Sequence, residues 1–69
     1  MIAKIEHREA RLTKIPVPRT DDVIEVSSIH YSIDTMHLNE TCVFFPNGDS
    51  DVRGTYDDHD KIVEELQHA

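Results

Sequence analysis

The stretch FFPNGDSDVRGTYDDHD, Phe44 to Asp60, places five aspartates around a Pro-Asn-Gly turn. Oxygen ligands at alternate positions of a loop can wrap around a hard cation, and Asn47, Asp49, Asp51 and Asp58 fall at the first, third, fifth and twelfth positions of a calcium loop. The sixth position of that pattern requires glycine, where this chain has Val52. A calcium-binding loop is therefore an alternative, and a hairpin turn with solvated aspartates is the expectation. No metal ligand and no cofactor are assigned.

The five histidines include no helical pair four residues apart and no His-x-His strand pair. His59 lies in Asp57-Asp58-His59-Asp60, where it could bind a transition metal together with a carboxylate. A single histidine among solvated acids is more typical of a surface residue whose pKa those acids raise. We therefore expect His59 to be exposed and to have no ligand.

Nucleophile motifs are absent from the sequence. Cys42 stands in the apolar run TCVFF, which is typical of a buried thiol with a raised pKa. No serine occupies a Gly-x-Ser-x-Gly elbow, and two glycines cannot build a phosphate-binding loop. Since nothing supplies an acid, a base and a pocket together, no catalytic residue is assigned and the protein is predicted not to be an enzyme.

Charge is the sequence feature with most functional content. The net charge is −7, and the acids concentrate in the second half of the chain. This sign argues against direct binding to nucleic acid but favours a protein partner with a basic surface. Short acidic chains of this kind also resemble, as a class, phage-encoded inhibitors, which implies an alternative function as a mimic of nucleic-acid charge. The acids expected to form the partner-binding surface are Asp49, Asp51, Asp57, Asp58, Asp60, Glu64 and Glu65.

A chain of 69 residues forms one small domain, 1–69, near the lower limit for folding around one apolar core. A core of this size supplies only about 3–5 kcal/mol without disulfides, metal or oligomerisation. With one cysteine, no intramolecular disulfide can form. We therefore expect self-association, most simply as a homodimer.

The elements that position these residues follow from local pattern. Pro16 and Pro18 separate residues 1–15, an N-terminal edge strand or helix with the strand preferred, from a β-meander over 22–56. Residues 57–68 are predicted to form a helix with Ile62, Val63 and Leu66 as its apolar stripe. The fold class is therefore α+β, a three- to four-stranded antiparallel sheet with a C-terminal helix packed on one face.

The apolar residues of 23–33 fall on both parities, with Ile24 and Val26 on one face and Val23, Ile29, Tyr31 and Ile33 on the other. A bulge near Ser27-Ser28 would reconcile them. Because one short helix covers only part of one face, the rest must be polar or paired. The residues predicted to lie in a self-association surface are His30, Tyr31 and Met36.

No window approaches the ~18 consecutive apolar residues of a membrane span, and residues 1–14 are too charged for the apolar segment of a signal peptide. The expected compartment is therefore the cytoplasm. The sequence as a whole predicts a small, non-enzymatic protein-interaction or regulatory module.

Overall fold

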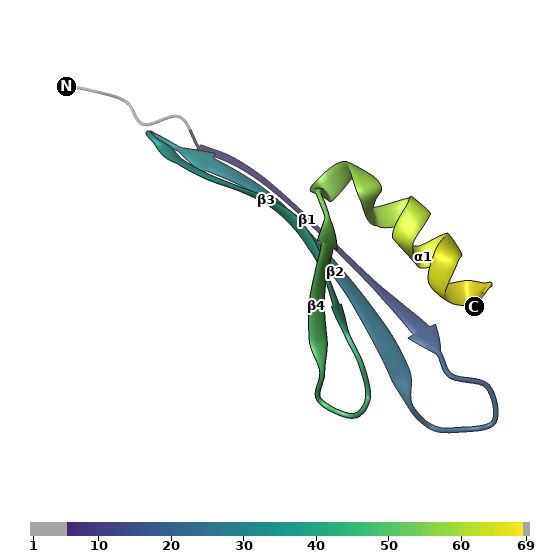
Figure 1. Ribbon diagram of the computed structural model, residues 1–69. Helices are drawn as coiled ribbons and strands as arrows, with labels where there is room; N and C mark the ends of the chain where they lie inside the picture. Colours follow the sequence, from purple (N-terminus) through teal and green to yellow (C-terminus); the bar gives the residue numbers. More distant parts are fainter. Residues whose placement is uncertain (1–5, 69) are drawn as a thin grey trace.

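The computed structural model of the chain describes residues 6–68, and Figure 1 shows their arrangement. Four strands precede a short 3₁₀ turn and a C-terminal helix. The elements are β1 (Glu6–Pro16), β2 (Val23–Ile33), β3 (Met36–Phe44), β4 (Ser50–Gly54), η1 (Tyr56–Asp58) and α1 (His59–Gln67). The α+β class, the antiparallel sheet and the C-terminal helix on one face of it are confirmed.

The sheet is a meander in the order β1-β2-β3-β4, with every neighbouring pair antiparallel. β1 is an edge strand, as the sequence predicts for the part of residues 1–15 that is described, while residues 1–5 lie outside the described range. Charged side chains alternate along it, which suits an edge because they discourage pairing with another sheet.

The predicted bulge at Ser27-Ser28 is wrong. β2 keeps an unbroken register with both neighbours, and the one register shift lies between Thr41 and Cys42 in the pairing of β3 with β4. The parity change in β2 has a simpler origin, because its two apolar sets serve two different faces of the sheet. Ile24 and Val26 pack in the core, whereas Ile29 lies on the opposite face.

α1 lies against β1 and β2 on one side of the sheet (Figure 1). Its residue Ile62 joins Ile15, Val26 and Val43 to form the core, and the rest of the predicted stripe, Val63 and Leu66, packs against it. The helix begins later than predicted because residues 56–58 form the 3₁₀ turn. No helix in the described part of the chain has the length and apolarity needed to cross a membrane.

The molecule is elongated, with principal extents of 57 × 20 × 15 Å. The buried residues lie in the half of the sheet beside α1, from Ser28 and Thr41 down to Ile15. Beyond that row, residues 6–10 and 29–40 form a three-stranded ribbon, here called the arm, that runs away from the helix (Figure 1). The small core therefore holds only one end of the sheet.

Candidate functional site

The sheet face opposite α1, here called the open face, is not covered by any described element. Strand residues alternate between faces, and Thr13 and Ile15 face the helix side, so Leu12 faces away. Each large hydrophobic residue that is exposed in the described range lies on this face by the same alternation, with exposed fractions from 37% to 63%. They are Leu12, Val23, Met36, Leu38, Phe44 and Val52.

The open face is nearly neutral although the chain is strongly acidic. Its charged side chains in the described range are two bases and three acids, a net charge of −1 against −7 for the whole chain. They are Glu6, Arg8, Lys14, Glu25 and Glu40. Arg8 pairs with Glu6 at 2.8 Å and lies over the Tyr31 ring, 5.4 Å from its centroid. An apolar surface with aromatic and arginine side chains and little net charge is typical of interface cores.

Two of the three residues predicted for self-association, Tyr31 and Met36, lie on the open face. His30 lies on the helix side instead, because it pairs with Glu9, which is in the same alternating set as Thr13. Phe44, the first aromatic of the apolar run TCVFF, is 45% exposed at the end of β3. In the sequence, one shared parity marks a common face for Met36, Leu38, Cys42 and Phe44. That parity does not reveal which face of the sheet the helix covers.

Cys42 also belongs to the open face, where it pairs with Val52 and Ser27. Its thiol is half-buried and donates a hydrogen bond to Glu40 Oε2 at 3.1 Å. That bond and burial raise the pKa of the thiol, in the direction the sequence predicts. The thiol is therefore a weak nucleophile and a natural reporter of whether the open face is covered.

Several of the acids predicted to bind a partner already have partners within the chain. Asp60 pairs with Arg11 at 2.7 Å, and Asp51 with Arg53 at 3.0 Å. The hydrogen bond and charge of Arg11 hold the pKa of Asp60 below its usual value. The Thr55 N–H, 2.9 Å from Asp58 Oδ2, lowers the pKa of Asp58 in the same way.

The remaining predicted acids do not gather at one place. Asp57, Glu64 and Glu65 are exposed along η1 and α1, without ion-pair partners among residues 6–68. Asp49 lies in the turn that precedes β4, so the length of that strand separates it from Asp57. The predicted acidic surface is therefore divided between exposed carboxylates around η1 and α1 and a separate carboxylate, Asp49, in the turn before β4.

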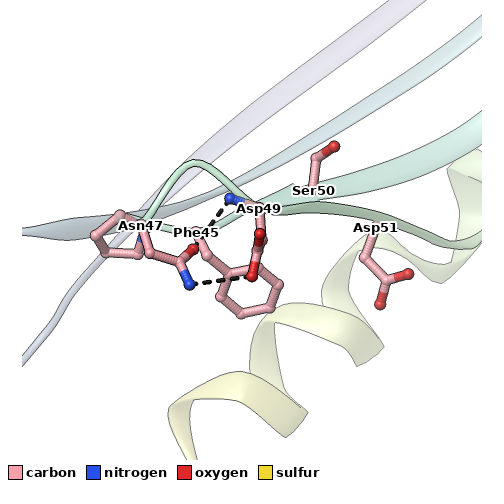
Figure 2. A pocket seen from close by; sticks show the side chains of 6 residues that line it. Phe45, Asn47, Asp49, Ser50 and Asp51 are labelled. Atoms are coloured by element: carbon pink, nitrogen blue, oxygen red, sulfur yellow. Dashed lines mark hydrogen bonds between the residues drawn. The ribbon is translucent and has the colours of Figure 1, made fainter.

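The turn between β3 and β4 forms a shallow depression lined by Phe45, Pro46, Asn47, Asp49, Ser50 and Asp51 (Figure 2). Within it the Asn47 side chain accepts from the Asp49 N–H and donates to Asp49 Oδ2, each at 3.0 Å. Two of the other predicted calcium ligands, Asp51 and Asp58, are engaged by Arg53 and Thr55. The loop is thus arranged as a hairpin turn, and its oxygens are used within the chain.

His59, the first residue of α1, has a fully buried side chain, which corrects the sequence-based expectation of an exposed one. Its Nε2 lies 2.7 Å from Thr13 Oγ1, and its Nδ1 lies 2.6 Å from Ser28 Oγ. Ser28 Oγ is also bonded to Thr41 Oγ1, which donates to the Thr55 carbonyl at 2.6 Å. A side-chain relay therefore crosses the sheet from β1 to the loop before η1.

The direction of the hydrogen bond from Thr41 to Thr55 determines the direction of the other bonds in this relay. Since Thr41 donates to Thr55, it must accept from Ser28, and Ser28 must then accept from His59 Nδ1–H. The neutral imidazole is left to accept at Nε2 from Thr13. Burial, followed by the charge of Arg11, lowers the pKa of His59, although Asp60 opposes the shift. The prediction that the pKa of His59 is raised was wrong because it considered only the acids next to His59 in the sequence.

The Ser28–His59 pair resembles part of a hydrolytic dyad but is placed as a structural element. Ser28 is 1% exposed and His59 is 0% exposed, so no substrate atom reaches the hydroxyl. The proton of Ser28 is donated to Thr41 and not to His59. The relay instead ties α1 to three strands, and it meets the hydrogen-bonding needs of buried polar groups.

A second group of histidines gathers on the helix-side face of the arm. His7 Nε2 and His30 Nδ1 lie 3.7 and 4.0 Å from Glu9 Oε2. The His37 ring packs edge-on against His30, with 5.6 Å between centroids. Sequence reasoning missed this group because its members come from three strands and only the register brings them together.

Comparison with protein-family models, curated proteins and solved structures finds no match to this chain in any of the three. Functional inference therefore rests on the surfaces described above. Among them, the open face carries the exposed large hydrophobic residues of the described chain and a net charge of only −1.

Proposed function

We propose that the protein is a small, non-enzymatic interaction module that pairs with a second copy of itself through the open face. One observation carries the proposal, namely that the exposed large hydrophobic residues of the described chain all lie on that face. Scattered exposed apolar residues are normal on a protein surface, but a contiguous apolar sheet face is typical of an interaction site.

The energetics of the single chain favour such a cover. Four hydrophobic residues are buried in the described range, at one end of the sheet. The helix supplies a second layer only over the core end of the sheet, so the arm is a single layer of strands and the open face lies in water along its whole length. Covering the open face would stabilise the chain by about 25 cal/mol for each Å² of apolar surface removed from water.

The dimensions of the open face suit a stable interface. β2 has eleven residues, which at ~3.3 Å each span about 36 Å, and three to four strands ~4.8 Å apart give a flat area on the order of 600 Å². Side-chain relief adds to this value. Specific interfaces bury about 800 Å² per partner, so two open faces packed together approach the standard size. Two twisted sheets stack most readily with their strands about 30° apart.

Charge favours a second copy as the occupant. Two chains of net charge −7 repel one another, and the approach that brings the fewest like charges together uses the nearly neutral open face. A strongly basic partner would instead be drawn to the acids around α1. The open face therefore suits a surface that is itself apolar and nearly neutral, as its own copy is.

Sedimentation velocity over a micromolar concentration series tests the proposal. We expect a reversible monomer–dimer equilibrium, with the Cys42 thiol reacting more slowly with Ellman's reagent as the dimer fraction rises. Leu12→Lys and Val52→Lys, both at exposed positions, should each shift the equilibrium towards monomer. Gln67→Lys adds the same charge at an exposed position of α1 and should leave the equilibrium unchanged.

A folded protein that stays monomeric throughout the series would overturn the proposal, and so would a dimer that both open-face variants leave intact. The acidic partner surface, the charge mimic and the calcium loop stay predictions. Reversing the charges of Asp57, Glu64 and Glu65 tests the first two through pull-down of partners, and a melt with calcium and chelator tests the third. The cytoplasm also stays a prediction, which cell fractionation would test.

A further inference from the structure

We propose that His7, Glu9 and His30 form a binding site for one divalent transition-metal ion of the zinc type. These are the described histidine, cysteine and acidic residues whose ligand atoms converge, all within 4.8 Å of one another. The site lies on the helix-side face of the arm and is therefore separate from the open face and from the proposed dimer.

The sheet register builds this group without any special loop. Glu9 and His30 are directly paired across β1 and β2, and His7 stands two residues before Glu9 on the same face. Directly opposed side chains in an antiparallel pair have Cβ atoms about 4.5–5.5 Å apart, close enough to share one ligand. The three donors are thus set by backbone pairing.

The ligand atoms, all within 4.8 Å of one another, must draw closer together to hold an ion. Zinc–ligand bonds of about 2.0–2.2 Å in tetrahedral geometry place the ligand atoms about 3.4 Å apart. His7 Nε2 and His30 Nδ1 are 3.7 and 4.0 Å from Glu9 Oε2. His7 and Glu9 are both exposed, so rotation of their side chains can close the remaining gap. Three protein ligands leave a position for solvent, as in open zinc sites.

Within residues 6–68, no lysine or arginine pairs with the Glu9 carboxylate. Among residues 6–68 its ion-pair contacts are with His7 and His30 alone. Arg11, the next residue on the same face of β1, is held by Asp60 at 2.7 Å. Arg8 lies on the open face with Glu6. An imidazole–carboxylate set suits zinc and related transition metals, whereas calcium and magnesium prefer oxygen ligands alone.

Neighbouring side chains hold His30 in position. Its ring packs edge-on against His7 and His37, with centroids 4.9 and 5.6 Å away, and the Tyr56 ring lies 6.1 Å away. The Tyr56 backbone is fixed in turn by its N–H bond to Asn39 Oδ1 at 2.8 Å. An ion bound here would join β1 to β2 in the arm, where no described side chain is buried. Small domains commonly use a metal as such a staple.

Zinc titration of the untagged protein by isothermal calorimetry tests the site, with a Cys42→Ser background to exclude binding to the thiol. We expect one ion per chain and a rise in melting temperature that a chelator reverses. His7→Gln, Glu9→Gln and His30→Gln should each weaken binding at least tenfold. His68→Gln removes an exposed histidine outside the group and should not change the affinity. Cobalt in place of zinc should give d–d bands that the His30→Gln variant loses.

Because the three ligands contribute nothing to the core, the metal-free variants should melt close to the parent, so lost binding can be read separately from lost folding. The absence of saturable binding would overturn the proposal. Equal weakening by His68→Gln and His30→Gln would do so as well, as would one ion shared by two chains. A monomer that binds one zinc ion would overturn the dimer and leave this site standing.

Discussion

Replacing Ser28 by alanine removes the centre of the relay that joins α1 to the sheet. Ser28 Oγ accepts from His59 Nδ1–H at 2.6 Å and donates to Thr41 Oγ1. Alanine has the same backbone and nearly the same volume, so the substitution deletes two hydrogen bonds with little change in packing. Because Ser28 is 1% exposed, water does not take its place.

The expected loss of stability follows from those two bonds. Each neutral hydrogen bond contributes about 1 kcal/mol net, and a buried donor left without an acceptor costs about 1–3 kcal/mol more. The imidazole can lower the second cost by moving its proton to Nε2 and donating to Thr13. We therefore expect Ser28→Ala to cost about 2–4 kcal/mol of unfolding free energy, a large part of the ~3–10 kcal/mol typical of a chain this long.

The neighbouring serine supplies a matched control. Ser27 lies on the open face of β2 and has no side-chain hydrogen bond among those of the described residues. Urea unfolding followed by circular dichroism should give a midpoint lower by about 2–4 M for Ser28→Ala, taking a slope near 1 kcal/mol per M. The Ser27→Ala midpoint should stay close to the parent. Nitrogen-15 spectra should show His59 as the Nδ1–H tautomer in the parent and as the Nε2–H tautomer in Ser28→Ala.

Two results would refute this reasoning. Equal destabilisation by Ser28→Ala and Ser27→Ala would mean that the relay contributes nothing beyond the general effect of the substitution. An Nε2–H tautomer in the parent would mean that the donor order deduced from the Thr41–Thr55 bond is wrong.

Two further predictions follow from the same end of the sheet. Because burial lowers the folded-state pKa of His59, the free energy of unfolding should be highest above the unfolded-state pKa near 6.5 and should fall as the pH drops below it, by up to about 1.4 kcal/mol per pH unit. Urea midpoints measured from neutral to mildly acidic pH check this. Stability that increases on acidification would contradict it. Gly54→Ala would place a Cβ against the Asp58 carboxylate that receives the Thr55 N–H, and should lower the melting temperature by about 5 °C in the parent. Its effect should be smaller in an Asp58→Ala background, and equal effects in both would rule out the contact as the cause.

The fold could be predicted from sequence because its determinants are local. Three features each depend on a few adjacent positions. They are the alternation of Ile24 and Val26 with polar residues, the turn at Asn47-Gly48, and the helical stripe of Ile62, Val63 and Leu66. Gly48 adopts a φ of +93°, which glycine permits without strain. The boundary of the helix was less predictable, because η1 depends on the bonds between Thr55 and Asp58.

The functional groups were predicted less well because they depend on register and on the placement of α1. His59 has only acids beside it in sequence, and its burial follows from meeting Thr13 and Ser28 of other strands. The His7–Glu9–His30 group has no spacing that marks it in the sequence, since the distance from Glu9 to His30 along the chain is fixed by the β1–β2 hairpin. The density of acids in the sequence led to the prediction of a partner-binding surface, but Asp51 and Asp60 are paired with arginines within the chain.

Along the arm, the two faces of the sheet differ in the side chains that they carry. Under α1, the helix-side face holds the apolar core and the buried relay, but along the arm it carries the polar residues His30, Ser32 and His37. On the open face, Tyr31, Ile33, Met36 and Leu38 continue the apolar surface to the tip of the hairpin, beside the charged side chains of Glu6, Arg8 and Glu40. A ribbon exposed to water on both sides would have no reason to keep one side apolar, since each such residue costs solubility and favours aggregation. In the proposed dimer, the interface would therefore extend past the helix and over the arm, along the full length of β2.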